Sequence, residues 1–211
     1  MSRKLRKLID RLQTTGYSQW NSGSEDATRT SEDSGSFKGF YPQDLSTSSI
    51  APFVPSPLEV VRKMLELAEV KPRDTLFDLG CGDGRIVIMA ANEFGSRAVG
   101  VDLNRQLITE AREKAERLGL EAARFIHGNM FDVDLRSADI VTMYLLTLAN
   151  EKVRPKLESE LKVGARVVTH DFPLSKWKCQ SRVNFEGESG KHVLYLYVWS
   201  GDENQDHHQA N

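Results

Sequence analysis

A glycine-rich stretch, Asp-Leu-Gly-Cys-Gly-Asp-Gly at residues 78–84, constrains this chain more than any other feature. A short apolar run, residues 75–79, leads into it and has the length and composition of a buried parallel strand. Residues 86–91 are again apolar and predict the buried face of a helix. A strand, a glycine turn and a helix in this order direct the free N–H groups of a helix N-terminus at a polar ligand. Glycines in the turn let the backbone approach that ligand closely.

The acidic residues around the loop indicate which ligand it is. A dinucleotide fingerprint would need glycine where the chain has Arg85. Asp78 ends the strand before the loop, and a carboxylate there suits a cation better than a pyrophosphate. Asp102 ends the next apolar run, residues 98–101, where an acid accepts both hydroxyls of a ribose. S-adenosylmethionine has a ribose, a cationic tail and no phosphate. The pattern therefore predicts this cofactor and resembles that of the class I S-adenosylmethionine-dependent methyltransferases.

Length and composition limit the number of domains and the kinds of partner that the chain can have. The 211 residues suffice for one domain of about 150 residues, and their formal net charge of −2 favours no nucleic-acid partner. Cys81 and Cys179 lie far apart and match neither a zinc site nor a disulfide framework, so no metal is expected. No apolar run approaches the length of a membrane span. We therefore expect a monomer without a transmembrane segment, in the cytoplasm.

The N-terminal part has a different composition. Residues 1–12 are basic, with apolar residues at helical spacing, which is typical of a mitochondrial presequence, of a surface contact or of an unstructured extension. A mitochondrial location is the alternative if this segment is a presequence. Residues 14–49 are rich in Ser, Gly and Thr and predict a flexible linker. The expected organisation is thus an N-terminal segment and linker (1–50), a methyltransferase domain (51–200) and a loose polar tail (201–211).

Strands that alternate with helices predict an α/β fold with a doubly wound, Rossmann-like, mostly parallel sheet. The first helix should start after Pro57, with Ser56 and Glu59 as a capping box, and run to about Val70. Further helices are expected at 104–118, capped by Asn104, and at 150–161. Further strands are expected at 123–127, 139–144 and 166–170, with an antiparallel pair at 182–186 and 193–199. Ligands bind beyond the carboxyl ends of such strands. One rim should therefore hold Asp78, Asp102, Asn129, Tyr144 and His170.

From about residue 51 to 199 the chain resembles the archaeal protein lysine methyltransferase family and its mitochondrial relatives that methylate the ATP synthase c-subunit. The motifs that carry the resemblance are P-F-V-P-S-P (52–57), D-L-G-C-G-D-G-R-I-V-I (78–88), G-V-D-L-N (100–104), D-I-V-T-M-Y-L-L-T (139–147), G-A-R-V-V-T-H-D-F (164–172) and L-Y-L-Y-V-W (194–199). The resemblance implies a class I methyltransferase fold of seven strands, the last antiparallel, and a protein substrate that presents a lysine. Residues 1–50 lie outside it.

The motifs and the resemblance together predict the cofactor contacts. Asp78 orders the methionine ammonium, Asp102 binds the ribose, and both are expected to be ionised at neutral pH. The remaining cofactor-binding residues are Gly80, Gly82 and Gly84 in the loop, Asn129 and Met130 at the adenine edge, and Phe53 in a lid. For Asn129, a plain loop cap is the competing interpretation.

Three residues are expected to line the methyl-transfer channel: Tyr144 first, then His170 and Asp171. For His170 a buried structural role is the alternative. The predicted activity is a protein-lysine N-methyltransferase that works by in-line displacement, in which desolvation of the amine and alignment replace a general base. A small-molecule methyltransferase and a non-catalytic cofactor-binding subunit are the alternatives. Methylation of nucleic-acid bases is disfavoured, because residues 142–146 replace the Asn/Asp-Pro-Pro-aromatic motif of such enzymes.

Overall fold

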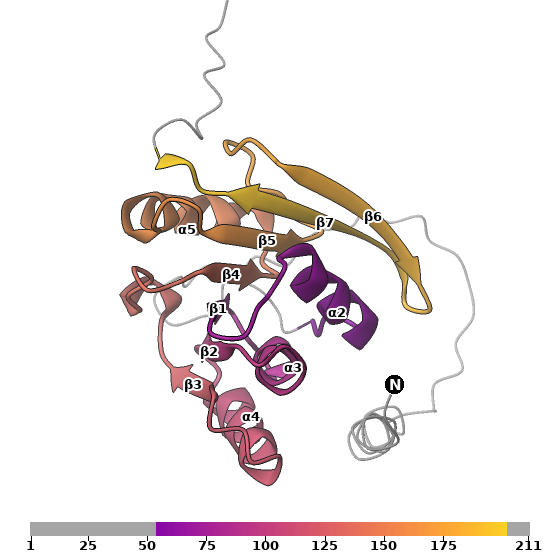
Figure 1. The fold of residues 1–211 in the computed structure, drawn as a ribbon, viewed down its shortest axis with the longest axis vertical. Helices are drawn as coiled ribbons and strands as arrows, with labels where there is room; N and C mark the ends of the chain where they lie inside the picture. The colour runs from indigo at the N-terminus through magenta and orange to yellow at the C-terminus, as the bar shows by residue number, and fades with distance from the viewer. Residues whose placement is uncertain (1–53, 202–211) are drawn as a thin grey trace, which may run out of the picture. The chain divides into compact units, whose positions relative to one another are not determined.

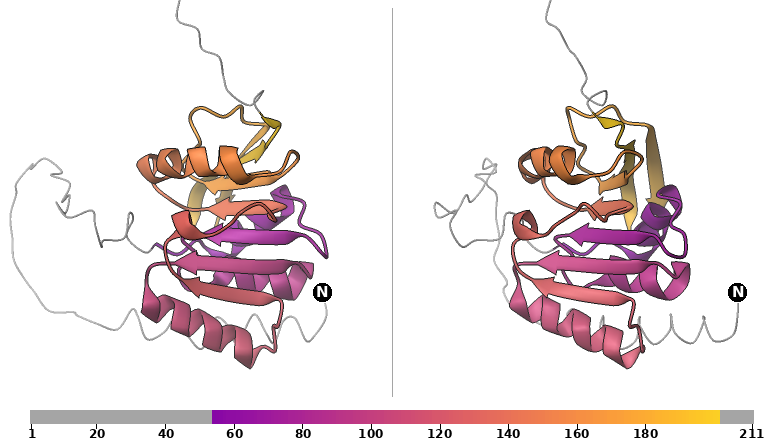
Figure 2. Two further views of the ribbon diagram at one scale, coloured as in Figure 1. Left: turned by 90° about the vertical axis from the view of Figure 1, so that its left-hand side faces the viewer. Right: turned by 60° about the vertical axis from the view of Figure 1, so that its left-hand side comes forward.

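The computed structural model describes residues 54–201, and these form one seven-stranded sheet in the order β3-β2-β1-β4-β5-β7-β6 (Figure 1). The strands are β1 (Thr75–Leu79), β2 (Arg97–Asp102), β3 (Ala123–His127), β4 (Ile140–Met143), β5 (Arg166–His170), β6 (Ser181–Gly187) and β7 (Gly190–Val198). The first five run parallel, and β7 is antiparallel to both of its neighbours. Figure 2 shows them side by side in one continuous sheet. The predicted sheet, mostly parallel with an antiparallel terminal strand, is confirmed.

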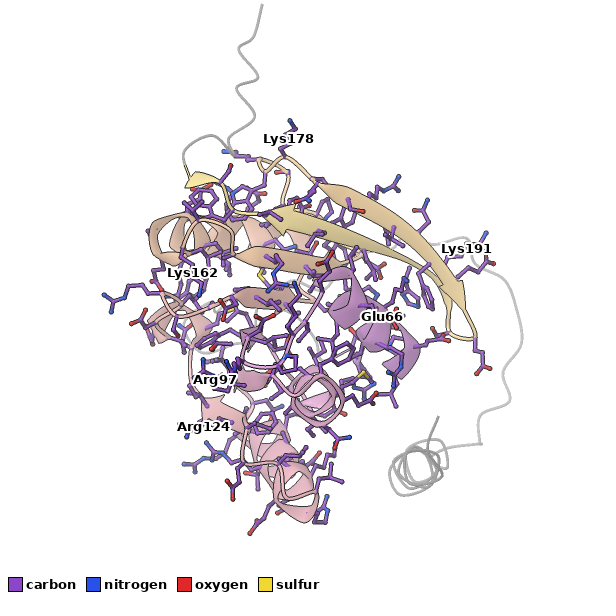
Figure 3. All side chains as sticks on the ribbon, in the orientation of Figure 1. Glu66, Arg97, Arg124, Lys162, Lys178 and Lys191 are labelled. Atoms are coloured by element: carbon purple, nitrogen blue, oxygen red, sulfur yellow. The ribbon has the colours of Figure 1, made fainter. Side chains whose placement is uncertain are left out.

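Helices cover both faces of this sheet. They are α2 (Leu58–Leu67), α3 (Arg85–Phe94), α4 (Arg105–Arg117) and α5 (Thr147–Glu160), with a short 3-10 helix η1 (Met130–Asp132). Apolar residues of α2, α3 and α4 belong to one hydrophobic cluster, and those of α5 belong to a second one on the other face (Figure 1). Side chains of β1 point alternately to the two faces of the sheet, so Leu76 packs in the first cluster while Phe77 and Leu79 pack in the second. The side chains of Lys178 and Lys191 extend outward from the fold (Figure 3).

The order of the strands fixes where a ligand binds. β1 lies between β2 and β4, so the chain moves to one side of β1 first and to the other side later. This is a topological switch point, where doubly wound sheets bind ligands beyond the carboxyl ends of their strands. Asp78 sits at that end of β1, paired with Gly100 in β2 and with Thr142 in β4.

The start of α2 differs from the prediction. Pro57 is its N-cap residue and supplies no capping side chain, and the helix ends at Leu67, three residues before Val70. Ser56 Oγ lies 2.9 Å from Nδ1 of His170 instead. Glu59 Oε1 accepts hydrogen bonds from N and Oγ of Ser189, at 3.0 and 2.8 Å. The predicted capping box is therefore wrong, because its side chains are engaged by β5 and by the β6–β7 turn.

Other local predictions agree with the structure. Asn104 caps α4, since its Oδ1 accepts from N of Gln106 at 3.0 Å and from N of Leu107 at 3.2 Å. Strands β3 and β5 span the predicted residues, whereas α5 begins at Thr147, three residues before its predicted start. No helix within residues 54–201 combines the length and the apolar character that a bilayer crossing needs. The predictions for residues 1–50, for Phe53 and for the polar tail beyond Gly201 fall outside the described residues.

Candidate functional site

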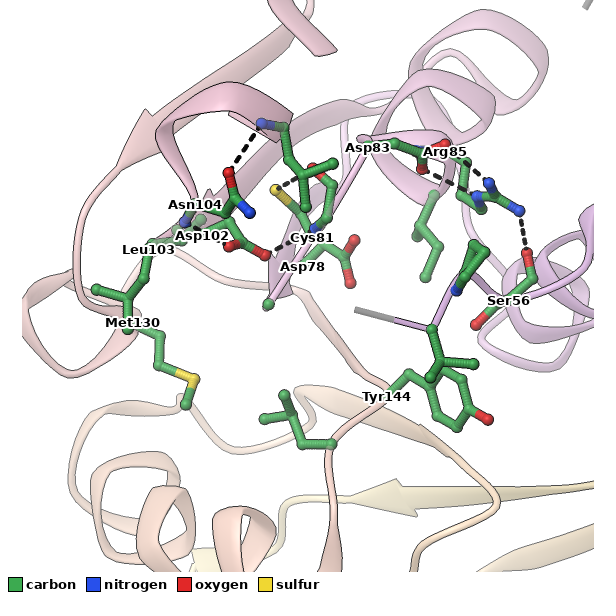
Figure 4. A pocket seen from close by; sticks show the side chains of 18 of the residues that line it. Ser56, Asp78, Cys81, Asp83, Arg85, Asp102, Leu103, Asn104, Met130 and Tyr144 are labelled. Atoms are coloured by element: carbon green, nitrogen blue, oxygen red, sulfur yellow. Dashed lines mark hydrogen bonds and ion pairs between the residues drawn. The ribbon is translucent and has the colours of Figure 1, made fainter. Parts of the chain in front are cut away.

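A pocket of about 330 Å³ opens where β1, β2 and β4 end, and it gathers most of the predicted site residues (Figure 4). Those in its lining are Asp78, Gly80, Gly82, Asp102, Asn129, Met130 and Tyr144. Gly84, His170 and Asp171 are not part of this lining. Residues 54–56 and Phe172, from segments far away in the sequence, complete the described wall.

The three glycines of the loop have different structural roles. All three have positive φ values: +81° for Gly80, +52° for Gly82 and +78° for Gly84. Such values are costly for residues with a Cβ. A Cβ on Gly84 would also lie 2.5 Å from the ring of Phe125. Gly84 thus lets α3 start against its neighbours, while Gly80 and Gly82 open the backbone to the pocket.

Asp78 is a buried acid at the floor of the pocket, with only 2% of its surface exposed. Its Oδ1 accepts a hydrogen bond from the hydroxyl of Thr142 at 2.8 Å. Burial raises the pKa of Asp78 to about 7, helped by the negative charges of Asp102 and Asp83 and opposed by the Thr142 hydroxyl. This differs from the expectation of a fully ionised carboxylate at neutral pH. A buried acid whose partner is a neutral hydroxyl suits a cationic ligand, which restores its charge.

Asp102 joins the glycine loop to the start of α4. Its Oδ2 accepts from the backbone N–H of Gly82 at 2.8 Å, and its Oδ1 accepts from that of Asn104 at 2.8 Å. Each carboxylate oxygen has a second lone pair. The two backbone bonds fix the carboxylate with both oxygens able to accept a vicinal diol.

Asn129 and Met130 follow β3 at the far end of the pocket. Asn129 Oδ1 accepts from the backbone N–H of Phe131 at 3.1 Å and caps η1, as its competing interpretation proposed, while the residue also lines the pocket. Met130 is buried, with 9% of its surface exposed, and gives this end an apolar wall suited to a flat base.

Arg85 has the sequence position of a solvated helix-start charge, but it ties two parts of the site together. Its guanidinium donates to Asp83 at 2.9 and 2.8 Å and to the backbone carbonyl of Ser56 at 2.7 Å (Figure 4). Both ion-pair partners are largely buried. Although burial opposes the charge of Asp83, the hydrogen bonds from Arg85 hold the pKa of that carboxyl below its ordinary value. Arg85 thereby fastens the segment before α2 to the loop.

Tyr144 forms the wall opposite the loop, at the end of β4. Its ring stacks on that of His170, with 3.9 Å between centroids, and its hydroxyl donates to Oδ2 of Asp171 at 3.5 Å. The structure therefore brings the three predicted channel residues together. Tyr144 faces the pocket, while the other two stand behind it. Asp171 adopts a left-handed backbone conformation, with φ of +58°, which is uncommon for a residue other than glycine.

His170 is fully buried, and both of its ring nitrogens have partners. Nδ1 lies 2.9 Å from Ser56 Oγ, and Nε2 lies 2.9 Å from Nδ1 of His192. Burial lowers the pKa of His170 to about 4, although Asp171 opposes the shift, so the ring is neutral at pH 7. Asp171 and the two histidines bring one possible ligand atom each within 4.8 Å of one another. We assign no metal to them, because hydrogen bonds already account for these atoms.

Sequence reasoning missed Thr142, Arg85 and His192. Thr142 and Arg85 stand inside the recognised motifs, where a polar residue in an apolar strand and a charge at a buried helix start were signals that could have raised them as candidates. His192 lies in an edge-proximal strand, 22 residues after His170, and no local pattern connects the two. Only the antiparallel pairing of β5 with β7 brings them together.

Comparison with known proteins agrees with this geometry. Residues 78–181 match the ANTKMT methyltransferase domain. The chain is 48% identical over 149 residues to the protein-lysine N-methyltransferase of Saccharolobus islandicus, which covers 70% of this chain and 92% of the relative. It is 39% identical to the mouse adenine nucleotide translocase lysine N-methyltransferase, over 60% of this chain and 56% of the relative.

A solved structure is similar as well. The crystal structure of an RNA methyltransferase from Salinibacter ruber in complex with S-adenosyl-L-homocysteine has a TM-score of 0.66 and 41% sequence identity. The match covers 70% of this chain and 94% of that one.

Proposed function

Since this chain belongs to the family that includes the Saccharolobus islandicus protein-lysine N-methyltransferase and the ANTKMT methyltransferase domain, we propose that it methylates lysine amines of a protein with S-adenosylmethionine as methyl donor. The observation that carries the proposal is the pair of acids, Asp78 and Asp102, at the ends of neighbouring strands over one pocket. The mouse and human lysine N-methyltransferases of the ATP synthase c-subunit, 36% and 34% identical to this chain, support a protein substrate.

The residues of the pocket suit the parts of this cofactor. Asp78 would hold the methionine ammonium, and Asp102 would hold the ribose hydroxyls. Met130 and Asn129 would lie against the adenine. When bound, S-adenosylmethionine supplies a methyl group on a positively charged sulfur. The part of the wall that these contacts leave for a substrate is formed by Ser56, Tyr144 and Phe172.

The protein must deliver a neutral amine to that wall. A lysine with its ordinary pKa of about 10.4 is protonated at pH 7, and removing the proton costs about 4.6 kcal/mol. The rings of Tyr144 and Phe172 exclude water and so lower the cost of the neutral form. Alignment of the amine with the methyl group then supplies much of the remaining rate enhancement.

RNA is the second candidate substrate, because the Salinibacter ruber relative carries that description at 41% identity. Two features of this chain favour a protein. The stretch after β4 reads Tyr144-Leu-Leu146 and offers no cluster of amide and carbonyl groups for a base. The net charge of −2 also provides no overall attraction to phosphates. The monomeric state and the cytoplasmic location stay predictions.

One assay tests the proposal. The purified protein is incubated with methyl-tritiated S-adenosylmethionine and either total protein or total RNA, and the labelled products are analysed by mass spectrometry. We expect label on protein lysines, and none on a peptide whose lysine is replaced by arginine, which stays protonated. The variant Asp78→Ala should lose both cofactor binding and label. Label in RNA alone would refute the lysine proposal.

A further inference from the structure

A continuous chain of hydrogen bonds leads from the pocket to the outer surface of α2. Ser56 Oγ lies 2.9 Å from Nδ1 of His170, whose Nε2 lies 2.9 Å from Nδ1 of His192. Nε2 of His192 lies 3.1 Å from Oγ of Ser189, which donates to Oε1 of Glu59 at 2.8 Å. Ser56 lines the substrate end of the pocket, whereas Glu59 is partly exposed to solvent. These hydrogen bonds thus connect the pocket with the partly exposed surface of α2.

The carboxylate at the outer end sets the direction of every bond. Hydrogen bonds from Ser189 lower the pKa of Glu59, so it is an acceptor at neutral pH. Ser189 therefore donates to it and accepts from Nε2–H of His192. With its ring proton on Nε2, His192 then accepts at Nδ1 from Nε2–H of His170, and His170 accepts at Nδ1 from the Ser56 hydroxyl. All four donors point outward, from the pocket towards Glu59.

We propose that Ser56, His170, His192, Ser189 and Glu59 form a relay that takes a proton from the substrate ammonium and holds it on Glu59 during methyl transfer. The proposal rests on the proposed function, since a lysine must lose one proton before each methyl transfer. Ser56 would touch the amine, and the histidines act through it as positioning residues. Each transfer yields a cationic methylammonium, so a second methylation at the same nitrogen must remove another proton and uses the relay again.

Each proton and electron pair in this transfer can be followed from donor to acceptor. An N–H bond of the ammonium breaks as Ser56 Oγ takes that proton, and the nitrogen keeps the electron pair with which it attacks the methyl carbon. Ser56 passes its own proton to His170 Nδ1, each ring passes on its Nε2 proton, and Ser189 protonates Glu59. The C–S bond then breaks, and its electrons neutralise the sulfonium. Once product leaves and water enters the pocket, the reverse movement restores the ring tautomers and gives the proton to that water.

The surroundings of His170 suit this role. Asp171, directly after β5, places Oδ2 3.3 Å from Nε2 of His170, and His192 from β7 contacts the same nitrogen. From β4, the Tyr144 ring stacks on it. Burial lowers the pKa of His170 to about 4, which keeps the ring neutral, so one of its two nitrogens has no proton and can accept one. Arg85 holds the carbonyl of Ser56 and so fixes the inner end of the chain.

The outer end is also built for this contact. The backbone N–H of Ser189 donates to Glu59 Oε1 at 3.0 Å, in addition to its hydroxyl. A Cβ on Gly187 would collide with the carboxylate of Glu59, so glycine at that position makes room for it under the β6–β7 turn. Ser56 and Glu59 have the right spacing to cap α2, but their side chains form the two ends of this row of hydrogen bonds instead.

The decisive variant is His192→Asn, whose side-chain oxygen can still accept from His170 but whose amide cannot pass a proton. We expect kcat at pH 7 to fall by about tenfold to a hundredfold, within the range of general acid–base effects. At pH 9.5 about a tenth of the free lysine is already deprotonated, roughly 300-fold more than at pH 7, so most of the rate should return. Cofactor Kd and Tm should match those of the wild type, and added imidazole should restore activity at pH 7.

Controls separate the relay from other causes. Glu59→Gln should lower kcat at pH 7, whereas Glu66→Gln, on the outer face of the same helix (Figure 3), should not. These two variants also test the relay if His192→Asn fails to fold. The relay would be overturned if His192→Asn lowered kcat equally at pH 7 and 9.5 and imidazole restored no activity. It would also be overturned if the wild type held one metal ion tightly per chain and His192→Asn lost it. A wild type that methylates no lysine would instead refute the proposed function.

Discussion

At the scale of single residues, Asp78 shows how binding and stability oppose each other in this fold. Its carboxyl is buried in the free protein, and burial raises its pKa to about 7 from an ordinary value of 3.8. The folded protein therefore binds that proton more tightly than the unfolded chain does. By linkage, the free energy of unfolding falls as pH rises from about 4 to 7, and the loss persists above pH 7. A cationic ligand beside Asp78 reverses this effect.

The variant Asp78→Asn should separate these two roles. Asparagine keeps an oxygen for the Thr142 hydroxyl but carries no charge. At pH 8 we expect the ligand-free variant to be more stable than the wild type by as much as about 4 kcal/mol. At pH 4 the difference should nearly vanish, and cofactor binding should be lost at both pH values. Urea unfolding at the two pH values and calorimetry with the cofactor measure this. A variant that is less stable at pH 8 would contradict the buried charge.

At the scale of elements, the strands and the cofactor acids could be predicted, but the contacts between distant segments could not. Apolar runs with a glycine turn locate β1, and Asn104 caps α4 as its local pattern indicates. Ser56 and Glu59 have the pattern of a capping box, yet their partners lie 114 and 130 residues away. Local spacing carries no information about such partners, because they arise from the pairing of β5, β7 and β6.

Arg85 provides the test at this scale, because it joins α3 to the segment that precedes α2. Arg85→Lys keeps the charge but cannot bridge Asp83 and the Ser56 carbonyl with the same planar fork. We expect cofactor affinity to fall about tenfold, because residues 54–56 form one wall of the pocket. Unfolding in urea should show a loss of about 1–3 kcal/mol, the range for hydrogen bonds to charged groups.

The chain contains a matched control for this change. Arg136 also pairs with the acid two residues before it, Asp134, but both side chains are exposed, at 77% and 56%. Arg136→Lys should therefore change stability by less than about 1 kcal/mol and leave cofactor affinity unaltered. If the two variants behaved alike, the role of Arg85 in holding the pocket wall would be refuted.

At the scale of the whole molecule, one sheet brings the cofactor acids, the aromatic wall and the hydrogen-bond chain to a common edge. β1, β2 and β4 supply the first two, and β5 and β7 supply the histidines behind them. The described wall of the pocket draws on residues between Val54 and Phe172. The Saccharolobus islandicus relative is matched over 92% of its own length by 70% of this chain.

Deletion of residues 1–49 should for this reason leave the cofactor site intact. We expect the Kd for S-adenosylhomocysteine to stay within about twofold and Tm within about 2 °C, because each described contact to Asp78 and Asp102 comes from residues that remain. Isothermal calorimetry and thermal unfolding of the two chains measure this. Phe53→Ala in the shortened chain then tests the predicted lid separately, and should lower kcat more than cofactor affinity. A tenfold loss of affinity on deletion alone would show that the first 49 residues contribute to the pocket.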